Sequence, residues 1–388
     1  MTYTNAEKMI QNATAIGSAD TARRLCAALD NPEKRTRVIK VLGESGKTST
    51  TILLSSAISA AGYRVGRLTV PHVHSVRESI CVDEKPISIE LYTASADSVK
   101  NAISEIKKDD ADFDPSAYDM LTAIAFCAFE ACDCDFALAE ISSGTYSAID
   151  DPILSVITTI SDQRTAKEIC ARLDRQTGET VTAMQSREVY KLIFDRCAEI
   201  NCRLSMPLRN SFIFMSASLK RVEFTYNTRL YSLGTGAYYQ VYNMLTVLEA
   251  TEALSRLGFR IPSVDICSAV LGQGIPLRFE SISVMPTIIV DRADTEGRRR
   301  RLIEALKMQS GFISKKPIVI CEGEKRKIYE EFTLMGRDVK VSEMGKKGAR
   351  KAIKALLSSL DENDTVVILG SSSYCEEIAK ITKEILMI

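Results

Sequence analysis

Short apolar runs and longer amphipathic stretches alternate along this chain. Residues 37–42 form a β-rich apolar run that stops at Gly43, as a buried strand does before a turn. The pattern then predicts a helix over 49–61, closed by Gly62, and a second strand over 63–70. A strand, a glycine-bearing loop, a helix and another strand in this order indicate a parallel sheet with helices packed on it.

The same alternation continues through the middle of the chain. Residues 1–30 are expected to be helical, with an apolar stripe over 13–29. Further helices are predicted over 120–131 and 239–257, and further strands over 136–141 and 154–160.

The pattern loosens over 276–285, where a linker is expected, and then restarts as a regular α/β unit of about 100 residues. Its predicted strands cover 287–291, 317–321, 338–341 and 365–369, and its predicted helices cover 296–308, 324–334, 346–359 and 375–386. This alternation is typical of a small Rossmann-like domain. The expected fold class is therefore α/β: a P-loop-type central domain with a mostly parallel sheet over 1–282, led by a helical segment over 1–35, and a smaller Rossmann-like C-terminal domain over 286–388.

The composition is that of an ordinary soluble globular protein and argues against several function classes. Over 388 residues, 45% are apolar and 26% charged, and the formal net charge is zero, so no long-range field attracts nucleic acid or an anionic membrane. No apolar stretch is long enough to span a bilayer, and the N-terminus lacks the pattern of a secretory signal. The eleven cysteines are expected to be reduced thiols of a cytoplasmic protein, and a structural zinc site is not expected, since the two histidines stand at 72 and 74 and Cys132 and Cys134 form a lone pair.

The segment Gly43-Glu44-Ser45-Gly46-Lys47-Thr48 is a candidate phosphate loop. Its glycines permit close approach of the backbone, the N–H groups at the start of the next helix point at an anion, and Lys47 adds a positive charge. The hydroxyls of Thr48 and Ser49 stand where a Mg²⁺ ligand or a helix cap is found. Val41 occupies the first glycine position of a full Walker A motif, so a plain strand-to-helix turn is the alternative. The position after a buried strand favours nucleotide binding.

At this loop the sequence resembles folylpolyglutamate synthases. Residues 38–49 are similar to the family segment VIHVAGTNGKGS. Residues 61–66, 69–73 and 76–80 are similar to successive parts of AGYRVGLFTSPHLVSFRERI, and residues 121–126 are similar to FLTAMAF.

Further along, the resemblance extends to the wider Mur ligases. The matching segments are Glu140-Ile141-Ser142-Ser143 for EVSS, Gln240-Val241-Tyr242-Asn243 for FNVYN, Arg278-Phe279-Glu280 for GRFE, Asp291 to Thr295 for DGAHN or DYAHT, and Gly370 to Tyr374 for TGSLY. Because these segments occur in family order over nearly the whole chain, the chain is identified as a divergent member of the folylpolyglutamate synthase and Mur ligase family.

The resemblance implies an ATP-dependent ligase that phosphorylates a substrate carboxylate and joins it to an amine through the acyl phosphate. It implies ATP and Mg²⁺ as cofactors, and a small-molecule carboxylate and an amino acid, such as folate and glutamate, as partners in the reaction. The implied site residues are Lys47 and Glu140 for catalysis; Gly43, Glu44, Ser45, Gly46, Lys47, Thr48, Ser49, Asn243, Arg278 and Asp291 for the nucleotide; Thr48, Ser49 and Glu140 for the metal; and His72 and Arg77 for the substrate.

These residue types also have structural interpretations. Glu140 could bond backbone groups at its strand end, but the carboxyl edge of a parallel sheet is where ligands usually bind, which favours function. Asn243 and Arg278, each taken alone, are more often structural, and His72 is equally well explained as a hydrogen-bonded loop histidine.

Four positions depart from the family pattern, and they are concentrated among the residues that serve the metal and carboxylate chemistry in the family. Val70 replaces a metal-binding serine and cannot coordinate a hard cation, and Arg164 replaces a metal-binding histidine with a permanent positive charge. Gln176 stands at the position of a carbamylated lysine, and Asp294 replaces the histidine of DGAHN.

Three hypotheses remain open after these departures. The first is a ligase with a rearranged metal site, in which Asp162 or Asp150 supplies oxygen. The second is a catalytically degenerate protein that has kept its nucleotide site. The third is a subunit of an amidoligase complex, in which a protein partner supplies the missing chemistry.

Overall fold

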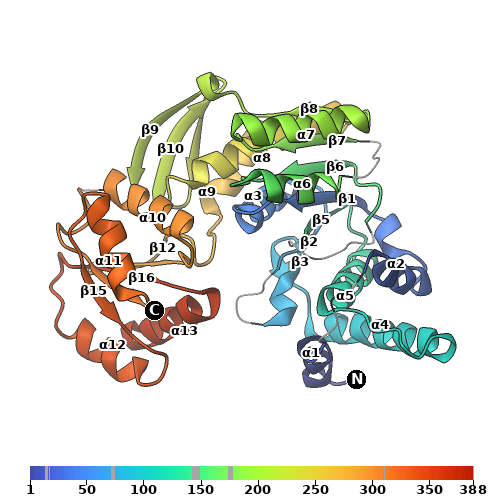
Figure 1. Ribbon diagram of the computed structural model, residues 1–388, viewed down its shortest axis with the longest axis horizontal. Coiled ribbons are helices and arrows are strands. Elements are labelled where there is room, and N and C mark those ends of the chain that lie inside the picture. Colours follow the sequence, from blue (N-terminus) through green and yellow to red (C-terminus); the bar gives the residue numbers. More distant parts are fainter. Residues whose placement is uncertain are drawn as a thin grey trace. The chain divides into compact units, whose positions relative to one another are not determined.

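The computed structural model describes residues 1–13, 16, 18–70, 75–141, 149–173, 178–309 and 311–387. The chain forms two compact units, drawn mainly in blue to green and in yellow to red (Figure 1). The first comprises Met1–Arg209 and Tyr242–Ala269, and the second comprises Asn210–Val241 and Val270–Ile388.

The first unit is built on one large sheet. Its strands are β1 Arg37–Leu42, β2 Val65–Leu68, β3 Ile80–Val82, β4 Lys85–Pro86, β5 Phe136–Glu140, β6 Leu154–Ile157, β7 Glu179–Thr182 and β8 Arg203–Ser205. They lie in the order β4-β3-β2-β5-β1-β6-β7-β8, parallel from β2 to β8 and antiparallel at β3 and β4. The strand before the candidate phosphate loop, β1, is therefore central.

Helices connect these strands. They are α1 Tyr3–Gln11, α2 Ala19–Ala28, α3 Lys47–Ala60, α4 Ile89–Asp109, α5 Ala117–Ala131, α6 Gln163–Cys170, α7 Arg187–Glu199 and most of α8 Gln240–Arg256 and α9 Ser263–Gly272, with 3-10 turns at Pro32–Lys34 and Val76–Ser79.

Apolar side chains cover both faces of the sheet. On one face, Val38, Leu42 and Ala139 belong to a large core that also contains Phe126 of α5. Since side chains alternate along a strand, Phe136 points to the other face, where its ring packs edge-on against Phe259 at 5.1 Å between centroids. Burial on both faces explains why these parallel strands read as continuous apolar runs.

Most helices of this unit begin at a polar side chain that caps the backbone. The caps of α1, α2, α4, α5, α6 and α7 are Thr2, Ser18, Ser88, Ser116, Asp162 and Ser186. By contrast, α3 begins at Gly46, which provides no side-chain cap in the described structure. Such an N-terminus suits an anionic ligand.

The second unit contains two further sheets. Its strands are β9 Phe212–Ser218, β10 Arg221–Tyr226, β11 Arg229–Leu233, β12 Glu280–Val284, β13 Thr287–Asp291, β14 Ile318–Cys321, β15 Lys340–Glu343 and β16 Thr365–Leu369. Its helices are α10 Glu296–Met308, α11 Lys325–Leu334, α12 Ala349–Leu357 and α13 Ser372–Leu386, and a 3-10 turn at Arg209–Ser211 leads into it.

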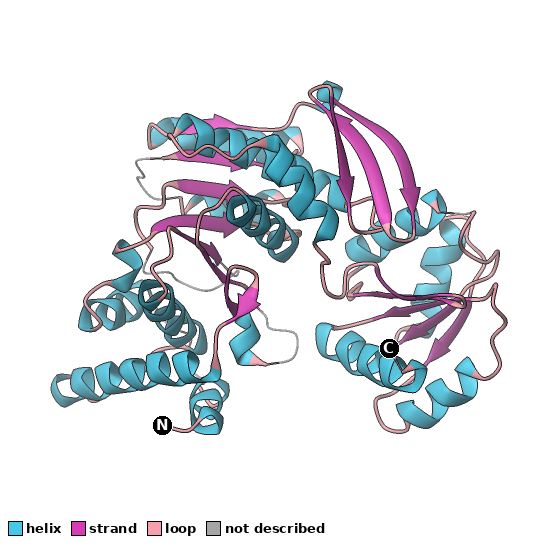
Figure 2. Cartoon of the chain, turned by 180° about the vertical axis from the view of Figure 1, so that it is seen from behind, coloured by secondary structure: helices cyan, strands magenta, loops and turns pink. Residues whose placement is uncertain are grey.

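The two sheets of this unit differ in topology. Strands β9, β10 and β11 form an antiparallel sheet, seen as three long curved arrows in Figure 2. The other sheet has the order β12-β13-β16-β14-β15, with four parallel strands and antiparallel β12 at one edge. Leu302 of α10, Phe332 of α11 and Val367 of β16 belong to its apolar core.

The predicted fold class is confirmed: a mostly parallel α/β sheet carries the candidate phosphate loop, and a smaller parallel sheet follows near the C-terminus. Strands β1, β13 and β16 and helix α10 have the predicted bounds. Within the described ranges, no helix is long and apolar enough to cross a membrane.

One local prediction was wrong. The linker expected over 276–285 contains β12, an edge strand paired only with β13 within its sheet. Its pattern is weak because Ile282 is the one buried residue of this strand, while Glu280, Ser281 and Ser283 are half-buried and Val284 is exposed. The segment 1–30, which was expected to be helical, contains the helices α1 and α2.

The predicted domain division, 1–282 and 286–388, stays a prediction. The compact units group 210–241 and 270–285 with the C-terminal strands. Compactness describes contacts and not independent folding, so it leaves that division open.

Candidate functional site

The candidate phosphate loop lies at the carboxyl edge of the large sheet. It follows β1, which pairs in parallel with β5 on one side and β6 on the other. Glu140 ends β5 and Thr158 follows β6, so both residues reach the same edge as the loop.

The first half of the loop is bound to the segment after β6. Gly43 has a φ of +127°, and a Cβ there would lie 2.2 Å from Thr158 Oγ1, so only glycine fits. The N–H groups of Glu44 and Ser45 donate to the Thr159 carbonyl at 3.2 and 3.1 Å. The Glu44 carboxylate accepts from the Ser161 N–H at 2.9 Å. The backbone N–H groups of Glu44 and Ser45 are therefore bonded to protein, although these two residues were predicted to contact the nucleotide.

The second half of the loop opens α3. Gly46 has a φ of +97°, and a Cβ there would lie 2.4 Å from Oδ1 of Asn243 on α8. The Lys47 ammonium donates to the Gly43 carbonyl at 2.8 Å. The lysine is therefore held across the loop. Asn243 lies against Gly46 of the same loop, and both residues were predicted to contact the nucleotide.

The side chain of Glu140 reaches the first turn of α3. Its Oε2 accepts from the Thr48 hydroxyl at 2.9 Å and from the Val70 N–H at 3.4 Å. Glu140 is 3% exposed. A buried carboxylate and a hydroxyl thus stand side by side next to the glycine loop.

This pair of oxygen donors fits Mg²⁺. The ion prefers oxygen, and where it binds substrate phosphates it commonly takes only one or two protein ligands. Thr48 and Glu140 supply such donors, whereas Val70 offers an N–H, which cannot be a ligand. Ser49, also predicted as a ligand, is 3% exposed within α3. Among the described residues there is no group of three or more His, Cys, Asp and Glu side chains that could hold an ion without such help.

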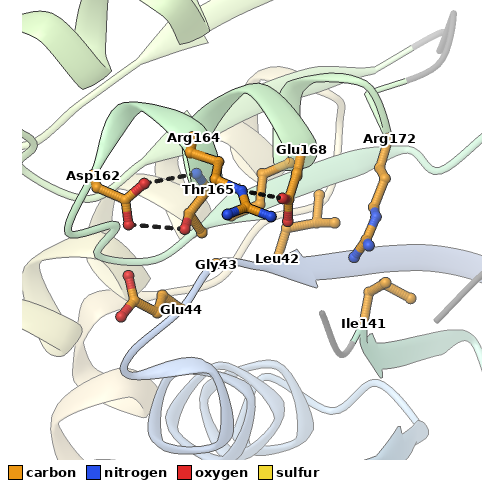
Figure 3. A pocket seen from close by; sticks show the side chains of 10 residues that line it. Leu42, Gly43, Glu44, Ile141, Asp162, Arg164, Thr165, Glu168 and Arg172 are labelled. Atoms are coloured by element: carbon orange, nitrogen blue, oxygen red, sulfur yellow. Dashed lines mark hydrogen bonds and ion pairs between the residues drawn. The ribbon is translucent and has the colours of Figure 1, made fainter. Parts of the chain in front are cut away.

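A cavity of about 450 Å³ adjoins the loop (Figure 3). It is lined by Leu42, Gly43, Glu44, Ile141, Asp162, Arg164, Thr165, Glu168, Ile169 and Arg172. The walls are β1 with its loop, the residue after Glu140, and one side of α6. Charges of both signs therefore surround a partly apolar space.

The residues invoked for a rearranged metal site make other contacts. The Arg164 side chain is 91% exposed, and its Nε lies 3.4 Å from Glu168 Oε1. Asp162 caps α6 by accepting from the Thr165 N–H at 2.9 Å, and the N–H and hydroxyl of Thr165 lower the pKa of this carboxyl. Asp150 accepts two hydrogen bonds from the Arg23 guanidinium at 3.0 and 3.1 Å. Both aspartates are thus engaged with protein donors.

In the second unit, Asp291 ends β13 and is 3% exposed. Its Oδ2 accepts from the Tyr239 hydroxyl at 2.5 Å and from the Phe279 N–H at 2.9 Å. Burial raises the pKa of Asp291 to about 6, although the nearby Arg278 acts in the opposite direction. Burial and the Asp291 carboxylate likewise raise the pKa of Tyr239 well above its usual value. Arg278 thus lies close enough to Asp291 to affect the pKa of its carboxyl, and the roles predicted for both at a nucleotide stay predictions.

The remaining predicted residues are placed as follows. The Arg77 guanidinium donates to the Ile87 carbonyl at 2.5 Å, so one of its N–H groups binds backbone. Asp294 forms ion pairs with Arg292 and Arg298. His72 and Gln176 lie outside the described residues.

The sequence analysis did not predict two features of this site. The segment 158–161 holds the loop, and Arg172 lines the cavity. The stretch that ends at Arg164 was matched to the family for its metal position and not for this contact, which depends on the strand order β5-β1-β6.

Known proteins resemble the chain along nearly its whole length. No protein-family model matches it. A dihydrofolate synthase/folylpolyglutamate synthase of Bacillus subtilis is 26% identical, over 93% of this chain and 94% of its own. A folylpolyglutamate synthase of Lacticaseibacillus casei is 24% identical, over 83% of this chain and 80% of its own.

Solved structures have the same fold. The folylpolyglutamate synthetase from Lactobacillus casei matches with a TM-score of 0.86 and 22% identity, over 98% of this chain and 99% of its own. A complex of a folylpolyglutamate synthase with AMPPCP and folate matches with a TM-score of 0.84 and 22% identity, over all of both chains. At this identity the likeness concerns the fold.

Fold and loop together are those of an α/β protein similar to ATP-dependent amide-forming ligases of the folylpolyglutamate synthase kind. The resemblance of its motifs to folylpolyglutamate synthases is confirmed, since proteins of that name are similar to the chain over most of its length.

The contact between Gly46 and Asn243 predicts a loss of nucleotide affinity on substitution. Gly46→Ala is expected to weaken binding of AMPPCP by about tenfold or more, because the new Cβ meets Asn243 Oδ1 and the loop must shift. Titration calorimetry measures the Kd. The matched control is Gly62→Ala, after the other end of α3, where φ is +91° and nothing lies within 4 Å of the new Cβ. Equal effects of the two changes contradict the proposed loop contact.

The buried carboxyl of Asp291 predicts a pH-dependent effect on stability. Since burial raises its folded-state pKa, ionisation costs stability as pH rises through about 6. Asp291→Asn is expected to raise the apparent Tm relative to wild type at about pH 7.5, and much less at about pH 4, because two pKa units correspond to on the order of 3 kcal/mol. Circular dichroism melts measure this difference.

The control for this prediction is Asp294, a carboxyl whose pKa is shifted in the opposite direction to that of Asp291. Although burial opposes them, Arg298 and Arg292 hold the pKa of Asp294 below its usual value, so this carboxylate stabilises the fold at neutral pH. Asp294→Asn is expected to lower the apparent Tm at about pH 7.5. A lower Tm for Asp291→Asn at that pH contradicts the cost assigned to its burial.

Proposed function

We propose that this chain is an ATP-dependent ligase that activates a small-molecule carboxylate as an acyl phosphate and joins it to the amino group of an amino acid. The observation that carries this proposal is the Thr48 hydroxyl at 2.9 Å from the buried Glu140 carboxylate, directly beside the glycine loop. Such a pair next to an uncapped helix N-terminus suits a metal–triphosphate complex.

A folate-type carboxylate and glutamate are the proposed substrates. The support is that relatives named folylpolyglutamate synthase match 83% and 93% of the chain, and that a structure with the same fold is a complex with AMPPCP and folate.

The loop and α3 would bind the triphosphate. Lys47 places a positive charge across the loop, and the first N–H groups of α3 point along the helix axis toward the same space. Thr48 and Glu140 would hold Mg²⁺, which, when bound, neutralises charge on the β- and γ-phosphates. Phosphoryl transfer between two anions depends mainly on such charge neutralisation and on alignment.

The other site residues have proposed roles that differ in support. Asn243 would contact the adenine, and its side chain lies against Gly46. Arg278 would contact phosphate, and Asp291 would contact the ribose through Oδ1, since Oδ2 already accepts two hydrogen bonds. Arg77 and His72 would contact the substrate, and Ser49, Glu44 and Ser45 would support the loop.

The proposed location is the cytoplasm. All eleven cysteines are free thiols, and most are buried, as in a protein that folds under reducing conditions.

Turnover with defined substrates tests the proposal. Protein incubated with ATP, Mg²⁺, glutamate and either dihydropteroate or folate is expected to release ADP and phosphate and to form the glutamyl product. Glu140→Gln is expected to lower kcat/KM by about a hundredfold or more, because the metal–phosphate site loses its charge. Product is measured by chromatography with mass detection.

A matched substitution separates this effect from loss of stability. Glu33 is also buried, at 6% exposure, and burial raises its pKa, so Glu33→Gln is expected to leave kcat/KM within about twofold of wild type. Absence of turnover in the wild type across folates, peptides and amino acids contradicts the ligase proposal and favours a nucleotide-binding protein without ligase activity.

A further inference from the structure

Three arginines lie together where β13 ends, at the carboxyl edge of the parallel sheet of the second unit. Asp294 forms ion pairs with Arg292, at 3.3 Å, and with Arg298 in the first turn of α10. The backbone N–H of Arg292 and the guanidinium of Arg278 both donate to the Leu277 carbonyl, each at 2.9 Å. These contacts link Arg278, Arg292 and Arg298 into one arginine cluster.

The backbone on both sides of Arg278 has an unusual conformation. Leu277 and Phe279 have φ angles of +54° and +52°, which cost energy for residues that carry a side chain. Both side chains are buried, and the Phe279 N–H donates to Asp291 at 2.9 Å. Strain of this kind persists where the surrounding structure fixes the backbone, and it is concentrated at ligand-binding sites. Arg278 is therefore held in place at a cost that a ligand contact would explain.

The positive charges of the arginine cluster exceed the negative charges beside it. Its three guanidinium groups face two carboxylates, those of Asp291 and Asp294. A third carboxylate, that of Glu280, accepts from the Leu277 N–H at 3.0 Å, but it is paired with Lys383 at 2.6 Å. Even with both aspartates ionised, the cluster therefore keeps one positive charge that these carboxylates do not cancel.

The arrangement is unfavourable without an anion. Burial lowers the pKa of Arg292, and the charges of Arg278 and Arg298 act in the same direction, so the three groups lie close enough to repel one another. Arg298 also stands in the first turn of α10, where the partial positive charge of the helix end disfavours a cation. Glu296 of the same turn forms no ion pair with Arg298 within the described ranges. A negatively charged ligand would offset both costs.

The cluster has hydrogen-bond donors left for such a ligand. A guanidinium group has five N–H donors, and each of these three forms one hydrogen bond through its side chain in the described part of the chain. The side chains of Arg292 and Arg298 are 20% and 28% exposed, so a ligand can reach them. A carboxylate offers two oxygens to such donors and a terminal phosphate offers three, so three guanidinium groups match a phosphate better.

We propose that Arg292 and Arg298 complete, together with Arg278, a binding site for a phosphate group of the nucleotide. The inference rests on the proposed nucleotide binding, in which Arg278 would contact phosphate and Asp291 the ribose. Arg292 follows Asp291 directly, so a ribose at Asp291 has its phosphates near these side chains. Arg292 stands where the family segment DGAHN has glycine and DYAHT has tyrosine, so the family pattern does not provide this contact.

Nucleotide titrations of arginine variants test the assignment. Arg292→Gln and Arg298→Gln are each expected to raise the Kd for AMPPCP by about tenfold, and the double variant by more, because charged hydrogen bonds to phosphate are lost. Arg292→Lys and Arg298→Lys keep the charge and are expected to raise it less. Because both arginines also pair with Asp294, calorimetry measures the Kd well below the lowest Tm of the set.

Arg300→Gln is the matched control. Arg300 is an exposed arginine of the same helix and forms no ion pair among the described residues, so its Kd for AMPPCP is expected to stay within about twofold of wild type. An equal loss of affinity in this control overturns the assignment, because the effect is then one of overall charge.

The remaining outcomes separate this inference from the proposed function. An unchanged Kd in both glutamine variants, with AMPPCP binding by the wild type, overturns the phosphate site and leaves the proposed nucleotide binding standing. A higher KM for glutamate with an unchanged Kd for AMPPCP also overturns it, because the arginines then bind a carboxylate. If the wild type binds no AMPPCP, the proposed nucleotide binding is wrong, and this inference is wrong with it.

Discussion

The close approach of Gly43 to Thr158 is the constraint on which the candidate site depends. Because β1 lies between β5 and β6, the loop after β1 must pass the ends of both neighbours. Gly43 leaves no room for a side chain against Thr158, and the Thr159 carbonyl takes the N–H groups of Glu44 and Ser45. The loop is therefore fixed on the β6 side, and its remaining half, with α3 and Lys47, faces Glu140 at the end of β5.

The sequence predicted those parts of the molecule that repeat a simple pattern. Strand β1, the glycine loop and α3 follow from apolar runs and glycine positions, and Glu140 follows from its place at a strand end. The long helix α4 was not predicted, since its buried face includes small and polar residues such as Ser95 and Ala96. The antiparallel strands β9 to β11 were not predicted either, although β9 begins with an apolar run over 212–215. Segment 158–161 and Arg172 depend on strand order, which no local pattern carries.

The departures from the family pattern gain a physical meaning from the structure. Val70 still contacts Glu140, but through its N–H, so this position supports the carboxylate without binding a cation. Arg164 lies on α6 in the wall of the cavity, where a permanent positive charge stands beside the loop. These two positions therefore contribute a backbone N–H to Glu140 and an arginine that pairs with Glu168.

The central claim is that the chain transfers phosphate from ATP to a carboxylate. Its most direct test uses a folate-type substrate whose carboxylate oxygens carry a heavy-isotope label, with ATP, Mg²⁺ and glutamate, and mass analysis of the released phosphate. An acyl phosphate requires that a labelled oxygen of the substrate leaves with each phosphate, so the account predicts labelled phosphate in step with product. Release of unlabelled phosphate together with product contradicts it.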